Sequence, residues 1–211
     1  MESEKELEEM TDMYLRDIAL NFMFAGKDSS GTTFLWFFYM LCKNPLIQEK
    51  VAQEVRDVVG LNHKANIDEF VAYLTDAALE KMHYIHAALT ETLRLYPAVP
   101  VVMECSTWPI YAMGRMPYIW GEYAEDFRPE RWLQNGIFLP ESSFKFVSLH
   151  AGPRICIGKD FAYGQMKIVS MTLLCYFRFK LVDETKIATY RTMFTLHMDG
   201  GLPMRAIPRT T

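Results

Sequence analysis

The chain has 211 residues, enough for one or two domains with a sizeable core. Half of its residues are hydrophobic and 23% are charged, a balance that excludes an intrinsically disordered protein. Lys and Arg number 22 against 26 Asp and Glu, for a formal net charge of −4, which argues against a nucleic-acid partner bound through its phosphates. The 14% of aromatic residues and the 14 Met favour a large apolar interior or pocket.

Helical spacing of apolar residues predicts one long helix over residues 4–42, which ends before Pro45 because proline has no N–H for the helical ladder. Gly and Ser residues are concentrated at 25–31, and both residue types loosen or bend a helix. The longest apolar run, residues 34–42, is much shorter than a membrane span of about 20 residues. The acidic N-terminus lacks the basic region of a signal peptide.

A second helix is predicted over residues 46–59 and a third over 76–95. Seven prolines and four glycines make residues 97–154 mostly loop. A further helix is expected from about Cys156 to about Phe179, and alternating apolar residues with a Gly-Gly pair predict a two-stranded hairpin over 189–208. The expected fold is therefore mainly α with a small β annex.

The four cysteines, at positions 42, 105, 156 and 175, form no CxxC pair, so neither a zinc finger nor a disulfide framework is indicated. Independent thiols of this kind are typical of a reducing compartment. His83 and His86 lie three residues apart on a predicted helix, but without a third ligand they are interpreted as ordinary core or surface histidines.

Cys156 is the candidate metal ligand. It stands at the expected start of a helix, where unpaired backbone N–H groups stabilise a thiolate. Gly152 and Gly158 leave the backbone bare on both sides, so that a flat, bulky group can approach the sulfur. This arrangement suits a haem iron, with Arg154 pairing a propionate. The alternative is a buried structural cysteine beside a Gly-Pro turn.

Three more segments precede this one in the chain: 25–30 (AGKDSS), 91–94 (ETLR) and 127–132 (FRPERW). Together with 152–158 (GPRICIG), they resemble in turn the oxygen-activation stretch, the ExxR helix, the PERF/PERW loop and the haem-ligand signature of the cytochrome P450 family. The resemblance covers nearly the whole chain but less than half of a normal family member. It implies a P450-like helical core whose N-terminal half is missing, with residues 1–211 forming one partial domain.

Within that domain the resemblance makes residues 4–42 the long oxygen-activation helix and residues 76–95 the ExxR helix. Residues 146–179 would be the haem-ligand loop with its following helix. The resemblance implies a haem-thiolate monooxygenase that uses dioxygen and haem b (iron protoporphyrin IX), with Cys156 as axial ligand. Electrons would come from NADPH through NADPH–cytochrome P450 reductase.

The segments 86–100, 111–116 and 125–132 look like plant long-chain fatty acid hydroxylases, which implies a fatty acid or similar apolar substrate. Full-length relatives are anchored on the cytosolic face of the endoplasmic reticulum membrane, and the resemblance implies the same location here.

Glu91 and Arg94 share a helix face, and spacing alone predicts a surface ion pair worth about 0–1 kcal/mol. The resemblance implies instead that Arg131 joins them in a buried structural network that locks the Cys156 loop. It also implies that Asp28 and Ser29 deliver protons to dioxygen as general acids. The alternative for Asp28 is a simply solvated carboxylate.

The chain departs from the family pattern at three places. Leu149 stands seven residues before Cys156 where the family has Phe, which implies altered packing rather than lost ligation. Ser29 replaces the usual Thr and keeps its hydroxyl. Residues 101–110 are too few for the several short strands of the family, so one strand followed by a junction is expected. The rival interpretation is an inactive truncated fragment that does not bind haem alone and exposes apolar surface.

Overall fold

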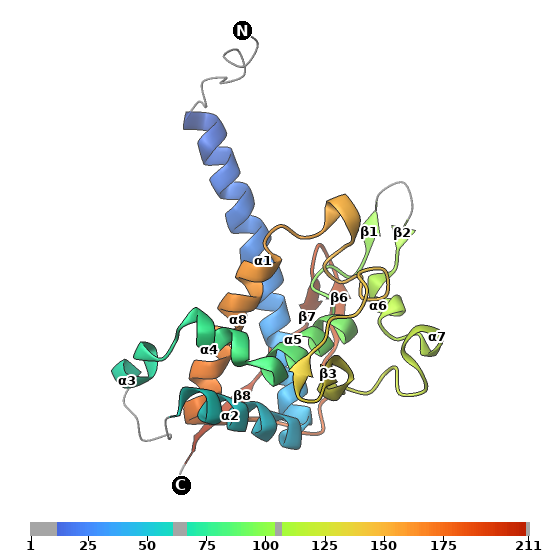
Figure 1. Cartoon of the computed structure of the whole chain (residues 1–211). Coiled ribbons are helices and arrows are strands. Elements are labelled where there is room, and N and C mark those ends of the chain that lie inside the picture. The colour runs from blue at the N-terminus through green and yellow to red at the C-terminus, as the bar shows by residue number, and fades with distance from the viewer. Residues whose placement is uncertain (1–11, 61–66, 104–106, 210–211) are drawn as a thin grey trace.

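The computed structural model describes residues 12–60, 67–103 and 107–209. Within these residues the chain is mainly helical, and its strands form small two-stranded sheets at the periphery (Figure 1). The expected mainly α fold with a small β part is therefore confirmed. No helix in the described part is long and apolar enough to cross a membrane.

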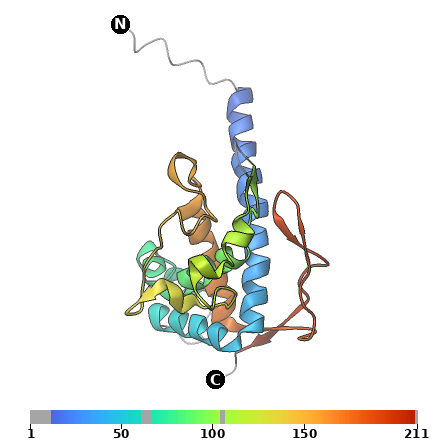
Figure 2. The same cartoon turned by 90° about the vertical axis from the view of Figure 1, so that its right-hand side faces the viewer.

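Helix α1 (Asp12–Lys43) is continuous through the Gly- and Ser-containing segment at 25–31. Residues 4–11 of the predicted helix lie outside the described residues. The C-terminal half of α1 is buried, with Trp36, Phe37 and Leu41 fully excluded from solvent. The N-terminal half projects beyond the body of the molecule (Figure 2). It leaves a set of large apolar side chains exposed, namely Met13, Tyr14, Leu15, Leu20, Phe22, Met23 and Phe24.

Helix α2 (Pro45–Val59) follows directly, because proline is favoured at the first helical position, where its missing N–H costs nothing. It ends at Gly60, whose φ of +68° suits glycine. The two predicted boundaries of this helix, set by proline and glycine, are confirmed to within one residue. A short helix α3 (Ile67–Ala72) comes next.

The predicted helix over 76–95 is wrong in one respect, since it is two helices: α4 (Asp76–Lys81) and α5 (His83–Leu95). Met82 between them has a non-helical ψ of 75°. The break has a tertiary cause. Both carboxylate oxygens of Glu54, on α2, accept hydrogen bonds from the first turn of α5, at 2.6 Å from the N–H of Tyr84 and 2.8 Å from that of Ile85. This side chain supplies α5 with its own N-terminal cap.

Helix α5 is the centre of the core. Every residue from Ala87 to Leu95 is buried, and the helix contacts α1, α2 and α8. The stretch after it is mostly loop, as predicted. Its short elements are α6 (Ile110–Met113), α7 (Pro117–Trp120), the 3-10 helix η1 (Pro129–Trp132), β3 (Leu133–Gln134), β4 (Ile137–Phe138) and the 3-10 helix η2 (Gly152–Arg154).

The interval 101–110 differs from expectation. It holds two short antiparallel strands, β1 (Val102–Met103) and β2 (Thr107–Trp108), rather than one strand and a junction. Two residues per strand suffice for a ladder of two partner pairs, which the ten-residue interval can accommodate.

Helix α8 (Lys159–Tyr176) leads directly into β5 (Phe177–Leu181). The predicted hairpin over 189–208 is wrong in its pairing. β6 (Tyr190–Thr192) pairs with β7 (Leu196–Met198), whereas β8 (Met204–Pro208) pairs with β5. Gly200 and Gly201, both with positive φ, redirect the chain from β7 toward β8 instead of folding it back.

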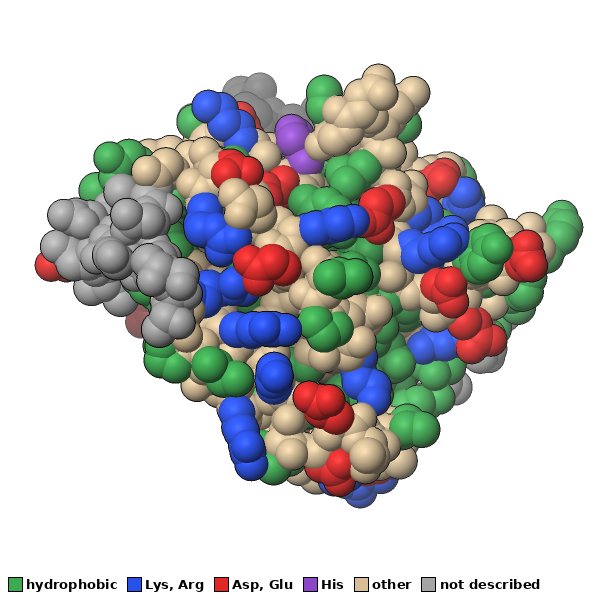
Figure 3. All heavy atoms as spheres, turned by 90° about the horizontal axis from the view of Figure 1, so that it is seen from below, with side chains coloured by type: hydrophobic (Ala, Val, Ile, Leu, Met, Phe, Trp, Pro, Cys, Tyr) green, Lys and Arg blue, Asp and Glu red, His purple; other side chains and the backbone are tan. Residues whose placement is uncertain are grey.

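Strand β5 is held in place by α2, because the side chain of Gln48 bonds to both the N–H and the carbonyl oxygen of Phe179 at 2.8 and 3.0 Å. The exposed face of this β5–β8 sheet is basic. Lys180 lies directly opposite Arg205, and both side chains are exposed. Lys and Arg side chains are numerous on the underside of the molecule, where acidic side chains are interspersed among them (Figure 3).

Candidate functional site

The candidate ligand Cys156 lies on the loop between η2 and α8, with its side chain exposed. Its N–H donates to the carbonyl oxygen of Leu149 at 2.9 Å, which closes the loop, and its own carbonyl accepts from Lys159 at 3.3 Å. Helix α8 begins at Lys159, so the expected helix start at Cys156 is wrong: the cysteine precedes the first turn. The alternative of a buried structural cysteine is also wrong for this residue.

Open space surrounds the loop. A Cβ added at Gly152 or at Gly158 would meet no atom within 4 Å, and Gly152 has a φ of +62° that favours glycine. Arg154 is exposed on η2. Ile157 and Phe161 present apolar side chains to solvent, at 88% and 76% exposure. An accessible thiol with bare backbone and apolar neighbours fits a large, flat, apolar group that carries a metal.

The other thiols in the described part differ from Cys156 in their surroundings. Burial raises the pKa of Cys42 to about 11, and burial also raises the pKa of Cys175. Both side chains therefore stay protonated at neutral pH and serve as packing groups. Cys105 lies outside the described residues. No cluster of three or more metal-binding side chains exists among the described residues, so His83 and His86 lack a third ligand.

Asp28 and Ser29 lie in the middle of α1, where the helix leaves the body of the molecule. Asp28 is exposed and Ser29 is half-buried. The Ser29 hydroxyl donates to the carbonyl oxygen of Ala25 at 2.6 Å, the back-bonding geometry of a helical serine. Among the described residues, no hydrogen bond or ion pair joins either side chain to the Cys156 loop.

Glu91, Arg94 and Arg131 are brought together. Glu91 and Arg94 are fully buried and form a two-pronged ion pair, with Arg94 Nε at 2.7 Å and Nη2 at 2.8 Å from the carboxylate oxygens. Arg131 Nε reaches Glu91 Oε1 at 3.4 Å. The surface pair that spacing alone indicated is therefore wrong, because both side chains are buried. Arg131 joins them with part of its side chain exposed, and the expected effect of the network on the Cys156 loop stays a prediction.

The guanidinium groups also organise the loops around α5. Arg94 donates to the carbonyl oxygens of Gly114, Ala124 and Asp126. Arg131 donates to those of Trp120 and Tyr123 at 3.0 and 2.9 Å. Two side chains thus satisfy five loop carbonyls, which fixes residues 114–126 against the helix.

Three contributors were missed by sequence reasoning. Trp132 Nε1 donates to Glu91 Oε2 at 2.8 Å and the ring is buried. Gly114 packs so tightly that a Cβ there would fall on the carbonyl oxygen of Arg94. Ser148 Oγ donates to the carbonyl oxygen of Leu93 at 2.8 Å and ties α5 to the segment that precedes the Cys156 loop. Trp132 directly follows Arg131 in the 127–132 segment, and this position could have indicated its role. Nothing in the sequence around Gly114 or Ser148 indicated theirs.

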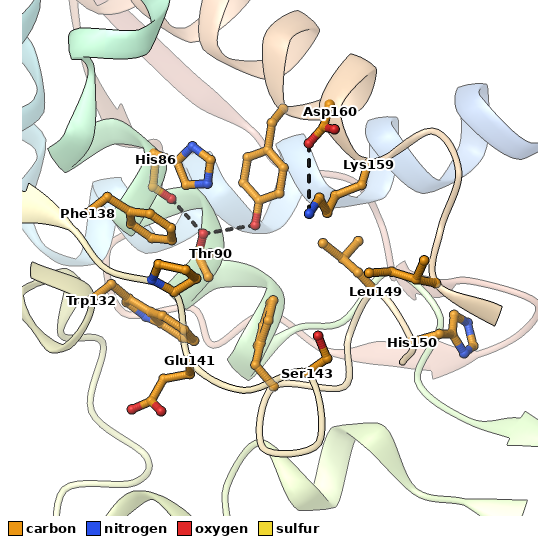
Figure 4. Close-up of a pocket in the computed structure, with 14 residues that line it drawn as sticks. His86, Thr90, Trp132, Phe138, Glu141, Ser143, Leu149, His150, Lys159 and Asp160 are labelled. Atoms are coloured by element: carbon orange, nitrogen blue, oxygen red, sulfur yellow. Dashed lines mark hydrogen bonds and ion pairs between the residues drawn. The ribbon is translucent and has the colours of Figure 1, made fainter. Parts of the chain in front are cut away.

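A cavity of about 250 Å³ lies behind the Cys156 loop, between α5, α8 and the loops that follow η1 (Figure 4). Leu149 and Ile155, on either arm of the loop, are part of its wall. Burial, followed by the positive charges of Lys167 and Lys159, lowers the pKa of His86 in this wall to about 3, so its imidazole is neutral at physiological pH. The Leu149 position therefore borders a void rather than a filled core.

Comparison with known proteins agrees with this geometry. The family model for cytochrome P450 matches residues 1–201. The chain is 47% identical to cytochrome P450 704C1 of Pinus taeda, over 98% of the chain and 45% of that relative. It is 38% identical to cytochrome P450 86B1 of Arabidopsis thaliana, over 96% of the chain and 40% of the relative.

A third relative, alkane hydroxylase MAH1 of Arabidopsis thaliana, is 34% identical over 90% of the chain and 39% of its own length. The chain thus spans less than half the length of these curated relatives. With a family model covering almost its full length, and with both an exposed, glycine-flanked cysteine and a Glu–Arg–Arg network centred on a buried ion pair, the chain belongs to the cytochrome P450 family.

Proposed function

We propose that this chain is the haem-binding part of a haem-thiolate monooxygenase that hydroxylates a long-chain fatty acid or a similar apolar substrate. The observation that carries the proposal is the Cys156 thiol, exposed on a closed loop with open space at Gly152 and Gly158. Cys156 would be the axial ligand of haem b, and Arg154 would pair with a propionate. Haem, when bound, supplies the activation of dioxygen.

The protein's own groups hold this arrangement in place. The Glu91–Arg94–Arg131 network fixes the loops around α5, and the bond from Ser148 to Leu93 ties the segment before Cys156 to the same helix. These residues act as structural supports rather than as catalysts. Rigid support of this kind keeps the thiol within a narrow range of positions, which a functional ligand requires.

Asp28 and Ser29 are proposed to hold and move protons on α1. Asp28 is open to solvent, and Ser29 next to it can pass a proton on by rotating its hydroxyl away from Ala25. Phe22, Met23 and Phe24, one to two turns earlier, present exposed apolar surface. They would face an apolar substrate, which agrees with a hydrocarbon chain.

The relatives support the substrate class, since one of them is an alkane hydroxylase by name. NADPH–cytochrome P450 reductase is the proposed electron donor, and the cytosolic face of the endoplasmic reticulum membrane the proposed location. A second candidate is a fragment that does not bind haem by itself. The exposed apolar face on the N-terminal half of α1 favours it, because such surface is normally covered.

A product assay tests the proposal. The purified chain, supplied with haem, reductase, NADPH and palmitic acid, is expected to yield hydroxylated palmitic acid by mass spectrometry. Cys156→Ser should abolish the product, and Cys175→Ala, which alters a buried packing thiol, should retain it. No product from the chain, together with product from a fusion to the N-terminal part of the Pinus taeda relative, would favour the second candidate. No product from either would overturn the proposed activity.

A further inference from the structure

The cavity behind the Cys156 loop adjoins the proposed haem site, because Leu149 and Ile155 of the loop line it, but it does not include the thiol. Among the described residues that line it, none belongs to α1 and Cys156 is absent. Its volume of about 250 Å³ exceeds the roughly 150 Å³ of an apolar protein cavity that accommodates benzene. The space is therefore sufficient for a molecule of one or two fused rings.

Aromatic side chains form much of the inner wall. The rings of His86 and Tyr163 are stacked, with centroids 4.2 Å apart and an interplanar angle of 6°. The Phe138 ring lies 4.2 Å from His86, and Trp132 makes an edge contact with Phe146 at 5.1 Å. Figure 4 shows His86, Phe138 and Trp132 on one side of the cavity and Leu149 across from them. Faces and edges of this kind favour a further aromatic ring.

One polar acceptor of the wall is left with unused capacity. Thr90 Oγ1 donates its single hydrogen to the carbonyl oxygen of His86 at 2.8 Å. The hydrogen shared by Thr90 Oγ1 and Tyr163 Oη, which are 2.9 Å apart, must then come from Tyr163. Tyr163 Oη therefore has lone pairs that accept no hydrogen bond from any described residue, although the side chain is only 6% exposed. A ligand that carries a donor can use this remaining acceptor capacity.

Charge is confined to the mouth of the cavity. Asp160 is almost fully exposed and pairs with Lys159 at 3.9 Å, and Glu141 pairs with Lys145 at 2.6 Å. His86 in the inner wall is neutral, because its burial opposes protonation. The positive charges of Lys159 and Lys167 near this wall disfavour a cation, and an anion would lose its hydration against the aromatic rings, so the site favours a neutral molecule.

We propose that this cavity binds a small, neutral aromatic molecule with one N–H or O–H group, which donates to Tyr163 Oη. The site adjoins the cysteine loop, since Leu149 lines the cavity and its carbonyl oxygen accepts the N–H of Cys156. Occupancy would hold Leu149, and through this bond the loop, in the arrangement described. The site stands apart from the proposed oxidation chemistry and needs no haem.

Binding is tested with indole and with indene, a ring system of the same size that lacks the N–H, by calorimetry on the purified whole chain. Leu149→Phe places a larger ring in the wall of the cavity and should weaken indole binding. Leu139→Phe is the matched control, because Leu139 is exposed outside the cavity on the same segment, and it should bind indole normally. Indole should bind about fivefold to tenfold more tightly than indene, the effect of one hydrogen bond.

Tyr163→Phe should remove that preference for indole. Nuclear Overhauser contacts from indole to the rings of Tyr163 and Trp132 in the unmodified chain provide a readout that depends on no variant. The proposal is overturned if indole does not bind, if Leu149→Phe binds it as tightly as the unmodified chain does, or if the contacts fall on other rings. Equal binding of indole and indene would overturn the role of Tyr163 as the acceptor.

Discussion

Glu91 and Arg94 form an ion pair in which neither side chain has any exposure to solvent. Both carboxylate oxygens of Glu91 are bonded to the Arg94 guanidinium, and Trp132 and Arg131 donate to the same carboxylate. A buried charge pair of this kind is stable only because nearly every donor and acceptor has a partner. The pair therefore organises the surrounding loops, and its removal is expected to destabilise these loops as well as α5.

Replacing Arg94 by Met should lower the free energy of unfolding by about 3–5 kcal/mol, because the buried Glu91 charge keeps only the 3.4 Å contact with Arg131 as an ion pair and three loop carbonyls lose their donor. Urea denaturation followed by circular dichroism measures this. Arg128→Ala is the control, since Arg128 is exposed and lies 3.8 Å from Asp126, and it should cost about 0–1 kcal/mol. A loss below about 1 kcal/mol for the Arg94 variant would refute the structural role of the network.

Gly114→Ala should be strongly destabilising, although the backbone there is in the ordinary helical region with a φ of −63°. The reason is contact rather than strain, because the added Cβ would overlap the carbonyl oxygen of Arg94. Gly164→Ala, on α8, is the matched control. A Cβ there meets nothing within 4 Å, so alanine should stabilise the helix by about 0.5–1 kcal/mol. Thermal melts of the two variants should shift in opposite directions; equal shifts would contradict the packing described.

Stability should fall as the pH is lowered from neutrality. Burial and the nearby positive charges of Lys167 and Lys159 lower the pKa of His86 to about 3 in the folded chain, below its ordinary value of 6.5. Between these two pH values His86 is protonated in the unfolded chain but not in the folded chain. The free energy of unfolding therefore falls by about 1 kcal/mol for each pH unit by which the pH is lowered. His86→Phe keeps the ring and removes the titration, and its slope between about pH 6 and about pH 4 should be shallower by about this amount. Parallel slopes for the two proteins would show that His86 is accessible to protons.

Lys180 and Arg205 place like charges directly opposite each other on β5 and β8. Lys180→Glu should stabilise the chain by about 0.2–1 kcal/mol, because the repulsion becomes an attraction across the strands. The gain should shrink at high salt, since both side chains are exposed. Urea denaturation at low and high sodium chloride measures it, with Lys180→Gln as the variant that only removes the repulsion. A gain that is independent of salt would point to packing instead.

Helix boundaries were predicted well where a single residue in the sequence sets them. Pro45 and Gly60 bound α2 as expected, because each acts through its own backbone. The break at Met82 was not predictable in this way, since the cap that favours it comes from Glu54 on another helix. The pairing of the tail was missed for the same reason. β8 pairs with β5, a strand that immediately follows α8, and no local pattern distinguishes this partner from the nearer β7.

In the candidate site, too, some features follow from the local sequence and others depend on contacts with distant residues. The glycines around Cys156 indicated an accessible thiol, and the thiol is exposed. Spacing placed Glu91 and Arg94 on one face but could not place that face in the core, because the loops that bury it come from residues 114–132. Ser148 gave no signal, since a loop serine becomes a support only when its partner, the Leu93 carbonyl, is known.

The most direct test of the account is the absorption spectrum of the purified chain after haem is supplied, in the reduced, carbon monoxide-bound state. The account predicts a Soret band at the position characteristic of thiolate ligation, one haem per chain, and loss of that band in Cys156→Ser but not in Cys175→Ala. Haem binding with an unchanged band in Cys156→Ser would contradict the assignment of this sulfur as the iron ligand, and no haem binding by the chain at all would contradict the proposal that the chain binds haem by itself.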